Sequence, residues 1–504
     1  MSKAKTLMIQ GTTSFTGKTV VVAGLCRIFA NLGYSVAPFK AQNMALNSFV
    51  TNDGCEIAYA QALQAQAAGI EPSAELNPVL LKPKADQISQ VIVKGKVLKD
   101  ISAKEYYKRF SKRAIKIIES AFDYLSKKFE IIVIEGAGNP AEININDFAN
   151  MKIAKLANAP VILVADIDRG GVFASIIGTL QLLQKEDRLR IKGIIINKFR
   201  GDLKLLQPGL EKLESMTKIP VIGVLPYDSK LILPEEDSIA LERKITKRKK
   251  IHILIVKLPR ISNFTDFEPL KYEPDVSIEI SENLDHADAI IIPGTKNSIE
   301  DALYLQETNL AEQINKKAKE GIPIVGICGG YQILGKKIID NFGIESKKGS
   351  LVNGLNLLDI ETSFEKFRSK KIVSLIKGQI IGNGPILRKI NGQVIEGYEI
   401  HSGTTKLGNS KPFAKVIIGI GNNFNSNFDG AINKNGLIFG TYFHGIFHNF
   451  VFRQAFLNFL RAKKKLPQVQ QDYFMNTRER NFDRIANLLT KHVDLGKVFE
   501  IMGI

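Results

Sequence analysis

Residues 6–19 read TLMIQGTTSFTGKT, and this stretch predicts the fold of the first part of the chain. The apolar residues at its start favour a β-strand, and the glycine-rich turn leads into a helix that begins near Lys18. Backbone N–H groups of such a turn bind phosphate oxygens, the lysine reaches the β- and γ-phosphates, and the Thr19 hydroxyl binds Mg²⁺. The candidate ATP-binding residues are Gly11, Thr12, Gly17, Lys18 and Thr19.

The spacing of this loop is a variant. The usual pattern has four residues between two glycines, but here Thr12 holds the first glycine's place and Gly11 stands one residue earlier. The variant resembles the dethiobiotin-synthetase branch of P-loop proteins, and a chance Gly-Lys-Thr in a loop is the alternative. An acidic partner is expected at the end of a neighbouring apolar strand, where residues 131–138 (IIVIEGAG) supply Glu135. Glu135 is a second candidate Mg²⁺ ligand, and an ordinary strand-end glutamate is the alternative.

Short apolar runs alternate with helical stretches through most of the chain, which predicts an α/β fold of two doubly wound domains with parallel sheets. The expected strands are 6–9, 35–38, 131–134, 161–165, 193–196, 221–225, 251–256, 289–292, 324–327 and 438–442. The expected helices include 18–32, 104–128, 451–463 and 478–489. A basic stretch at 239–250 predicts a linker. We therefore expect one domain at 1–238 and a second at 251–504 that ends in a helical extension.

Composition and cysteine content describe the class of protein. A chain of 504 residues is too long for one hydrophobic core, and 44% hydrophobic with 24% charged residues is typical of soluble globular proteins. Apolar runs such as 161–165 are too short to span a membrane, and no signal-peptide pattern is present. Cys26, Cys55 and Cys328 are too few and too widely spaced for a disulfide framework or a zinc site. These features predict a cytoplasmic protein without a membrane partner.

The formal net charge of +18 has three interpretations: a nucleic-acid-binding surface, a lysine-rich surface bias, or a field that attracts polyanionic substrates. The basic residues fall in scattered clusters such as 243–250 and 461–465. No aromatic–basic recognition motif accompanies them. We therefore do not expect nucleic acid as a partner.

The most specific local feature is the segment 324–335, IVGICGGYQILG. An apolar strand ends at Cys328, Gly326 lies two residues before it and Gly329 follows, which is the arrangement of a nucleophile elbow. The helix that follows would lower the pKa of the thiol, and the backbone N–H of Gly329 would bind an oxyanion. A buried structural cysteine is the alternative, and it is the commoner role of a free cysteine.

Two further segments favour the catalytic interpretation. The glycine turn after the strand 289–292 suits Gly294 to supply a second oxyanion N–H, and His444 follows another strand where a base would meet the thiol. His401 and His448 are competing bases. A Cys328 thiolate paired with His444 would attack the γ-carboxamide of glutamine, release ammonia and form a thioester that water hydrolyses.

Segments along nearly the whole chain resemble the cobyric acid synthase family, the glutamine-dependent enzymes of adenosylcobalamin biosynthesis. The segments that carry the resemblance are PFKAQNMALNS (38–48), NPVLLKP (77–83), EGAGNPAEIN (135–144), ADIDRGGVFA (165–174), INKFRGD (196–202), LPEED (233–237), LPRISNFTDF (258–267) and PGTKN (293–297). The P-loop alone would indicate only a superfamily. The runs DIDRGGVF and RISNFTDF are far more specific.

The resemblance implies the reaction. The family amidates the b, d, e and g carboxylates of adenosylcobyrinic acid a,c-diamide, with one ATP and one glutamine per amide, to give adenosylcobyric acid. ATP, Mg²⁺, glutamine and a corrinoid are thus the expected ligands, and a basic protein suits a polycarboxylate. Lys40 becomes a second candidate phosphate-binding cation, because a lysine at the next strand end fits the dethiobiotin-synthetase pattern. An internal channel for ammonia is also implied, while the oligomeric state stays open.

One position departs from the wider class of glutaminases. Many of them carry a glutamate two residues after the catalytic histidine, and here that position is Ile446. The family also lacks this glutamate, so the third catalytic residue stays open and Glu399 is one candidate. Two alternative functions remain: a cobyrinic acid a,c-diamide synthase, and a regulatory P-loop ATPase of the ParA/MinD type. The second would leave Cys328 and residues 251–450 unexplained.

Overall fold

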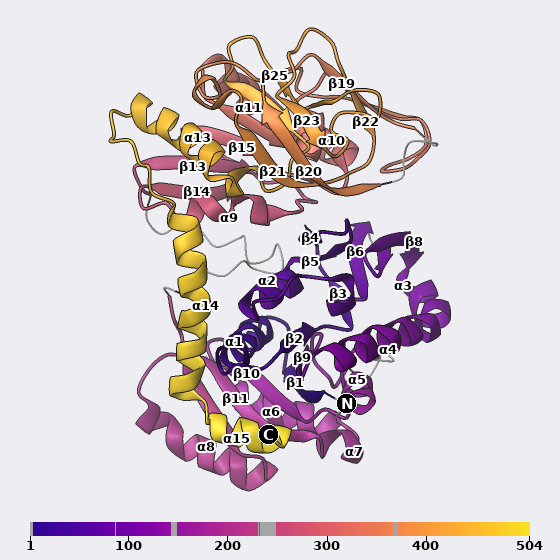
Figure 1. Cartoon of the computed structure of the whole chain (residues 1–504), viewed down its shortest axis with the longest axis vertical. Helices are drawn as coiled ribbons and strands as arrows, with labels where there is room; N and C mark the ends of the chain where they lie inside the picture. Colours follow the sequence, from indigo (N-terminus) through magenta and orange to yellow (C-terminus); the bar gives the residue numbers. More distant parts are fainter. Residues whose placement is uncertain (1–3, 86, 143–148, 230, 232–247, 366–370) are drawn as a thin grey trace. The chain divides into compact units, whose positions relative to one another are not determined.

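The structure is a computed structural model of the chain and describes residues 4–85, 87–142, 149–229, 231, 248–365 and 371–504 (Figure 1). It divides into two compact units. The first contains Met1–Ala45, Glu56–Leu233 and Arg478–Ile504, and the second contains Leu46–Cys55 and Pro234–Thr477.

This division assigns two described segments differently from the predicted domains 1–238 and 251–504. The segment Leu46–Cys55 belongs to the second unit, and the C-terminal segment Arg478–Ile504 belongs to the first. The LPEED segment and the predicted linker up to residue 247 lie outside the described residues, as do the last two residues of the EGAGNPAEIN segment.

A six-stranded parallel sheet forms the centre of the first unit, in the order β12-β11-β10-β1-β9-β2. Its strands are β1 (Lys5–Gly11), β2 (Val36–Phe39), β9 (Ile131–Glu135), β10 (Val161–Asp166), β11 (Ile191–Phe199) and β12 (Val221–Pro226). All six strands predicted for this half of the chain are present. The three strands that come first in the sequence (β1, β2 and β9) lie on one side of the boundary between β1 and β10, and the three that come last (β10, β11 and β12) lie on the other. The direction of winding therefore reverses at that boundary.

Both faces of this sheet are buried, which explains its continuous valine and isoleucine runs. Along β1, Leu7 and Ile9 pack in a core with α1, α14 and α15, while Met8 between them packs in a core with α4, α5, α6 and α8. The helices are α1 (Lys18–Asn31), α2 (Tyr59–Ala67), α3 (Ala103–Glu105), α4 (Ser111–Lys128), α5 (Met151–Leu156), α6 (Val172–Leu182), α7 (Lys185–Arg188), α8 (Leu203–Thr217), α14 (Tyr473–His492), which belongs to this unit from Arg478 onward, and α15 (Leu495–Met502). The helix predicted at 104–128 is divided, because a π-helical turn (Tyr106–Phe110) precedes α4.

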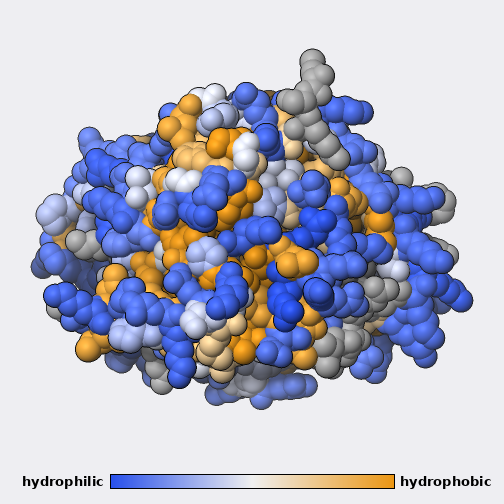
Figure 2. Space-filling view, turned by 90° about the horizontal axis from the view of Figure 1, so that it is seen from below, coloured by the Kyte–Doolittle hydropathy of each residue, from blue (hydrophilic) through white to orange (hydrophobic). Residues whose placement is uncertain are grey.

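The first unit also has a smaller sheet that was not predicted, in the order β3-β6-β7-β8. Its strands, with the separate short strand β5, are β3 (Gln42–Met44), β5 (Glu56–Ala58), β6 (Val79–Ala85), β7 (Ile88–Val93) and β8 (Lys96–Ser102). Figure 2 shows the face of this unit that lies at the bottom of Figure 1, where apolar side chains emerge between hydrophilic ones. Leu205 of α8 is 84% exposed.

The main sheet of the second unit has the order β14-β13-β15-β16-β26-β25, and every pair except β26–β25 is parallel. Its strands are β13 (Ile251–Val256), β14 (Val276–Ser281), β15 (Ala289–Ile292), β16 (Ile324–Ile327), β25 (Ala431–Ile432) and β26 (Ile438–Thr441). The helices of this unit are α9 (Glu268–Lys271), α10 (Ser298–Glu307), α11 (Leu310–Lys319), α12 (Gly329–Ile333) and α13 (Phe450–Lys463). The four strands predicted for this half are present, so the predicted α/β class is confirmed for both units.

Two four-stranded, mainly antiparallel sheets complete the second unit, in the orders β18-β17-β19-β22 and β21-β20-β23-β24. Their strands, with the short strand β4, are β4 (Ser48–Val50), β17 (Lys337–Asp340), β18 (Ser350–Asn353), β19 (Ile360–Phe364), β20 (Ile372–Ile380), β21 (Val394–His401), β22 (Thr404–Leu407), β23 (Ala414–Ile418) and β24 (Phe428–Asp429). Across the described residues of both units, no helix has the length and apolar character needed to cross a membrane.

Candidate active sites

The predicted phosphate site lies at the carboxyl edge of the first unit's sheet, near the point where the winding reverses. Three neighbouring strands end there: β1 at Gly11, β9 at Glu135 and β2 just before Lys40. Ligands of open parallel sheets bind at such a position, because the loops after neighbouring strands diverge there. The fold thus brings together residues that are more than 100 positions apart in the sequence.

The glycines of the loop are required by close packing. A Cβ atom on Gly11 would lie 2.4 Å from the hydroxyl of Thr16 and 2.9 Å from Nζ of Lys18. Gly17 caps α1 with a φ of 97°, and a Cβ there would lie 2.2 Å from the side-chain amide of Asn197. That amide donates to the carbonyl of Thr16 at 2.8 Å. The loop therefore has room only for backbone at the place where phosphate is expected.

Lys18 is folded back over this loop. Its ammonium donates to the carbonyl of Thr13 at 3.0 Å and to that of Gly138 at 3.2 Å. Thr12 is fixed beside it, because its N–H donates to Val164 O and its carbonyl accepts from the side chain of Asn139. The two carbonyl oxygens that accept from Lys18 are weaker acceptors than a charged phosphate oxygen. A bound triphosphate would therefore attract the ammonium away from them.

Glu135 is the centre of a buried polar cluster. Its Oε1 accepts from the Thr19 hydroxyl at 3.1 Å and from the Lys40 ammonium at 2.8 Å, and its Oε2 accepts from the side-chain amide of Gln64. The structure therefore places three predicted residues together and adds Gln64, which the sequence analysis missed. Gln64 lies on α2 within an alanine- and glutamine-rich stretch, and no local pattern distinguishes it from its neighbours.

The donor set of this cluster fits Mg²⁺. Thr19 and Glu135 offer hard oxygen ligands, and no group of three or more acidic, histidine or cysteine side chains suited to a metal occurs among the described residues. Mg²⁺ typically takes only one or two protein ligands and completes its shell with water and nucleotide phosphates. Thr19 and Glu135 would hold such an ion, which would supply positive charge to neutralise phosphate, and the Lys40 ammonium would then turn from Glu135 toward the phosphate.

The predicted thiol site lies at the carboxyl edge of the second unit's main sheet. Cys328 stands between β16 and α12 with φ 54° and ψ −110°, a conformation that an L-residue adopts only at a cost of roughly 1–3 kcal/mol. Its N–H donates to the carbonyl of Thr441 on the next strand at 2.8 Å, and its side chain is almost fully buried, with 6% exposure for the residue. Strain of this kind is typical of a nucleophile elbow.

The glycines around Cys328 permit this turn. A Cβ on Gly330 would lie 2.1 Å from the carbonyl of Ile292, and one on Gly329 would lie 2.5 Å from the Thr295 side chain. A Cβ on Gly326 would meet the carbonyl of Gly330 at 2.7 Å. The turn therefore packs directly against the loop after β15, which contains the predicted oxyanion residue Gly294.

His444 follows β26 and is paired with a residue that was not predicted. Its Nδ1 lies 2.8 Å from Oδ2 of Asp266, and Oδ1 of the same carboxylate accepts the N–H of Gly445 at 2.7 Å. Burial alone would lower the pKa of His444, but the charges and hydrogen bonds of Asp266 and Cys328 raise that pKa to about 10. A protonated histidine beside the thiol is the charge state that stabilises a thiolate.

Gly294 lies next to this histidine. A Cβ on Gly294 would be 3.2 Å from Cε1 of His444 and 3.2 Å from the carbonyl of Ser262. Gly294 is further held by its own carbonyl, which accepts from the N–H of Ser262 at 2.8 Å. The two predicted oxyanion residues thus lie beside the thiol and its base, Gly294 in the loop after β15 and Gly329 at the start of α12.

Glu399, the earlier candidate for the third catalytic residue, has a different neighbour. It lies 3.5 Å from Nε2 of His401 and accepts from Ser374 at 2.6 Å, with the backbone N–H groups of Ile420 and Gly421 as further donors. Burial would raise the pKa of Glu399, but His401 and these donors lower it. The carboxylate that contacts His444 belongs to Asp266 and not to Glu399.

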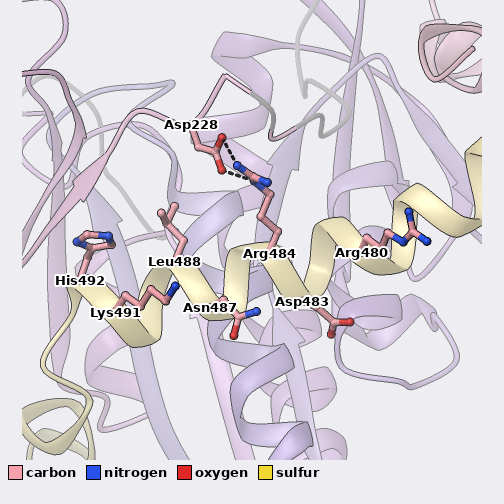
Figure 3. A pocket seen from close by; sticks show the side chains of 8 residues that line it. All are labelled: Asp228, Arg480, Asp483, Arg484, Asn487, Leu488, Lys491 and His492. Atoms are coloured by element: carbon pink, nitrogen blue, oxygen red, sulfur yellow. Dashed lines mark hydrogen bonds and ion pairs between the residues drawn. The ribbon is translucent and has the colours of Figure 1, made fainter. Parts of the chain in front are cut away.

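One pocket, of about 490 Å³, lies along α14 in the first unit (Figure 3). Arg484 reaches from the helix to Asp228, and Nη2 of this arginine donates to Oδ1 of Asp228 at 2.8 Å. The residues that line it are Asp228, Arg480, Asp483, Arg484, Asn487, Leu488, Lys491 and His492. None of the predicted site residues is among them.

Known protein families match both parts of the chain. Residues 7–240 match the CobQ/CobB/MinD/ParA nucleotide binding domain, and residues 252–452 match the CobB/CobQ-like glutamine amidotransferase domain. The probable cobyric acid synthase of Methanothermobacter thermautotrophicus is 53% identical over 507 residues, which cover 99% of each chain.

The chain belongs to the cobyric acid synthase family. The cobyric acid synthase of Pelotomaculum thermopropionicum is 48% identical over 99% of this chain and 97% of its own, and the probable enzyme of Methanosphaera stadtmanae is 49% identical over 97% and 98%. As a member of the cobyric acid synthase family, the chain is a glutamine-hydrolysing amidotransferase that uses ATP in cobalamin biosynthesis. The match covers both units.

Proposed function

We propose that this protein amidates the b, d, e and g carboxylates of adenosylcobyrinic acid a,c-diamide to give adenosylcobyric acid, with Cys328 and His444 as the glutaminase residues. The observation that carries the proposal is the arrangement of Cys328, His444 and Asp266 at one sheet edge. The family resemblance of the whole chain supplies the choice of substrate.

Glutamine hydrolysis begins with attack of the Cys328 thiolate on the γ-carboxamide carbon of glutamine. Charge develops on the carbonyl oxygen, where the N–H groups of Gly294 and Gly329 would stabilise it. The His444 imidazolium then gives its proton to the departing nitrogen, so ammonia leaves and a thioester remains. Neutral His444 next takes a proton from water, which attacks the thioester and releases glutamate. Asp266 holds the histidine ring and stabilises its charged form throughout.

Carboxylate activation would occur in the first unit. A corrin carboxylate oxygen attacks the γ-phosphorus of ATP, ADP leaves, and an acyl phosphate forms. Lys18 and Lys40 would neutralise the transferred phosphoryl group, while Thr19 and Glu135 would hold Mg²⁺. Ammonia then attacks the acyl carbon and phosphate leaves, which completes one amide. Because ammonia must arrive unprotonated, an enclosed passage from Cys328 is part of the proposal.

The decisive experiment incubates the protein with glutamine, MgATP and adenosylcobyrinic acid a,c-diamide and follows the product by mass spectrometry. We expect four successive mass changes, each equal to the replacement of OH by NH₂. Cobyrinic acid is offered as a parallel substrate, because an a,c-diamide synthase would accept it and stop after two amides. Formation of glutamate without any mass change in either corrinoid would contradict the proposal and indicate another acceptor.

A further inference from the structure

A short segment from the first part of the chain packs within the glutaminase unit. Leu46–Cys55 lies between β3 and β5 in sequence, and both of those strands belong to the first unit, yet the segment itself belongs to the second. Two of its residues are almost fully buried there, with exposures of 2% for Asn47 and 0% for Ser48. Such burial of an asparagine requires specific hydrogen-bond partners.

Asn47 and Ser48 form hydrogen bonds with other parts of the second unit. Oδ1 of Asn47 accepts the N–H of Phe264 at 2.9 Å, and the N–H of Ser48 donates to Oδ1 of Asn263 at 3.1 Å. The carbonyl of Ser48 accepts from the hydroxyl of Tyr398 at 3.2 Å. Asn47 and Ser48 are thus bonded to three residues on two different elements of the same unit.

Asn263 and Tyr398 contact His444 directly, and Phe264 begins the turn that carries the carboxylate partner of His444. The side-chain amide nitrogen of Asn263 lies 3.2 Å from Nε2 and 3.5 Å from Nδ1 of the imidazole. The ring of Tyr398 stacks on it, with centroids 5.2 Å apart and an angle of 16° between the planes. Phe264 opens the 3₁₀ turn Phe264–Phe267, which carries the Asp266 carboxylate that binds Nδ1.

The backbone at Asn263 needs such support. Its φ of 51° and ψ of 40° are left-handed, a conformation that asparagine adopts more readily than most residues but still at a cost. The bond from Ser48 N–H holds the side chain of Asn263, and the bond from Phe264 N–H to Asn47 holds the residue that follows it. Without them, the turn that carries Asp266 would lose a fixed position relative to the imidazole.

We propose that Asn47 and Ser48 are positioning residues for the glutaminase base, and that they act on His444 through Asn263, Asp266 and Tyr398. The proposal rests on the catalytic roles proposed for Cys328 and His444. It assigns to the glutaminase site two residues that lie inside the stretch 7–240 matched by the nucleotide-binding family. Glutamine hydrolysis in this chain therefore depends on a segment that lies some 200 positions before the glutaminase sequence.

The test replaces Asn47 by alanine in the full chain. Loss of the acceptor for Phe264 N–H lets the turn and the imidazole shift, and misplacement of a catalytic group by about 1 Å costs up to a hundredfold in rate. We expect kcat for glutamine hydrolysis to fall by roughly tenfold to a hundredfold, with KM for glutamine and ammonia-dependent amidation within about twofold of wild type. Asn52→Ala, an exposed position in the same segment, is the matched control and should retain full activity.

A double-mutant cycle separates positioning from a general loss of packing. If Asn47 acts through the turn at Asn263, then Asn47→Ala should add little to the loss caused by Asn263→Ala, because both changes disturb the same element. Additive losses, or an Asn47→Ala kcat within about twofold of wild type, would overturn the proposal. If Asn47→Ala does not fold, Tyr398→Phe decides: it keeps the stacked ring and removes the hydroxyl that donates to Ser48, and an unchanged kcat would overturn the proposal.

Cys328→Ala is measured in the same assay, because it tests the catalytic role of the thiol separately from the positioning role of Asn47. If Cys328→Ala still hydrolyses glutamine, the proposed function of the thiol fails and the role of Asn47 falls with it. If Cys328→Ala is inactive and Asn47→Ala is normal, only the positioning role is overturned. If both variants lose glutamine hydrolysis and the losses in the double-mutant cycle are not additive, the result supports the catalytic role of Cys328 and the positioning role of Asn47.

Discussion

At His444, the Asp266 carboxylate opposes the effect of burial and favours the imidazolium. A carboxamide at this position would keep an acceptor for the ring but remove the negative charge, so Asp266→Asn should lower the pKa of His444 from its value of about 10. The imidazolium would then lose its proton at a lower pH. We expect the alkaline limb of the pH profile of kcat/KM for glutamine to move to lower pH, and kcat at neutral pH to fall by about tenfold or more.

The matched control is Glu399→Gln. Glu399 adjoins His401 and not His444, so this change should leave the alkaline limb where it is in the wild type. An Asp266→Asn profile that coincides with the wild-type profile would show that Asp266 does not hold the charge state of the base. If the alkaline limb shifted in Glu399→Gln and not in Asp266→Asn, Glu399 would be the third catalytic residue.

Sequence alone could predict the site residues that lie in a recognisable short motif. Cys328 and Lys18 each stand where a strand meets a glycine-rich turn, and such a turn can be recognised from a few adjacent letters. Asp266 lies 178 positions from His444, so only the folded chain shows that the two meet. The family-specific run RISNFTDF did contain it, and a single acidic residue in such a run is the signal that could have identified it.

Among the elements, the contact of α1 with α14 depends on a glycine. A Cβ on Gly24 would lie 2.4 Å from Cδ1 of Leu489 and 2.6 Å from Cγ2 of Ile485, both on α14. Gly24→Ala gains about 0.5–1 kcal/mol in helix propensity, but overpacking of this kind typically costs 1–3 kcal/mol. We expect the helices to separate, with faster hydrogen exchange at the backbone amides of α14.

Gly178 on α6 provides the comparison. A Cβ there would meet no atom within 4 Å, so Gly178→Ala should keep the propensity gain of about 0.5–1 kcal/mol without a steric cost. Exchange of the α14 amides should equal that of the wild type in this variant. If Gly24→Ala also left α14 exchange unchanged, the contact would be adaptable and its packing would not depend on glycine.

The strands that could be predicted are those buried on both faces of a sheet, because such strands consist almost entirely of apolar residues. The predicted parallel strands are valine- and isoleucine-rich runs such as β9, which is buried throughout, and residues 161–165 of β10, which are buried as well. The antiparallel strands β17 to β24 were missed. Strand β20 reads IVSLIKGQI and alternates between buried and partly exposed positions, and β24 has only two residues. Strands of that kind depend on their partners, and short polar runs do not distinguish them from loops.

For the whole molecule, the order of residues in the chain does not follow the division into units. Leu46–Cys55 and Arg478–Ile504 each pack with the unit that holds the other half of the sequence. Composition and periodicity describe each stretch by itself, whereas membership of a unit is decided by tertiary contacts. The C-terminal helices were predicted correctly as helices, but nothing in their pattern indicated that Ile485 and Leu489 would join the core of α1.

Because each unit has its own hydrophobic core, the two chemistries should be separable by single substitutions. Cys328→Ala removes the thiol from the second unit, so glutamine-dependent amidation should be lost while amidation with an ammonium salt stays within about twofold of wild type. Lys18→Ala removes a phosphate-binding charge from the first unit and should lower amidation from either nitrogen source by about a hundredfold or more, while glutamine hydrolysis persists. Product mass, ADP and glutamate are measured together.

Cys26→Ala is the thiol control for this pair of variants. Cys26 is buried in the core beside α14, and burial raises the pKa of its thiol far above the usual range, so it is not a nucleophile at neutral pH. Both activities should survive in this variant. If Cys328→Ala lost ammonia-dependent amidation as well, the thiol would be structural, since a nucleophile that only liberates ammonia is dispensable once ammonia is supplied. The ammonia-dependent rate of Cys328→Ala therefore decides whether Cys328 acts by chemistry or by packing.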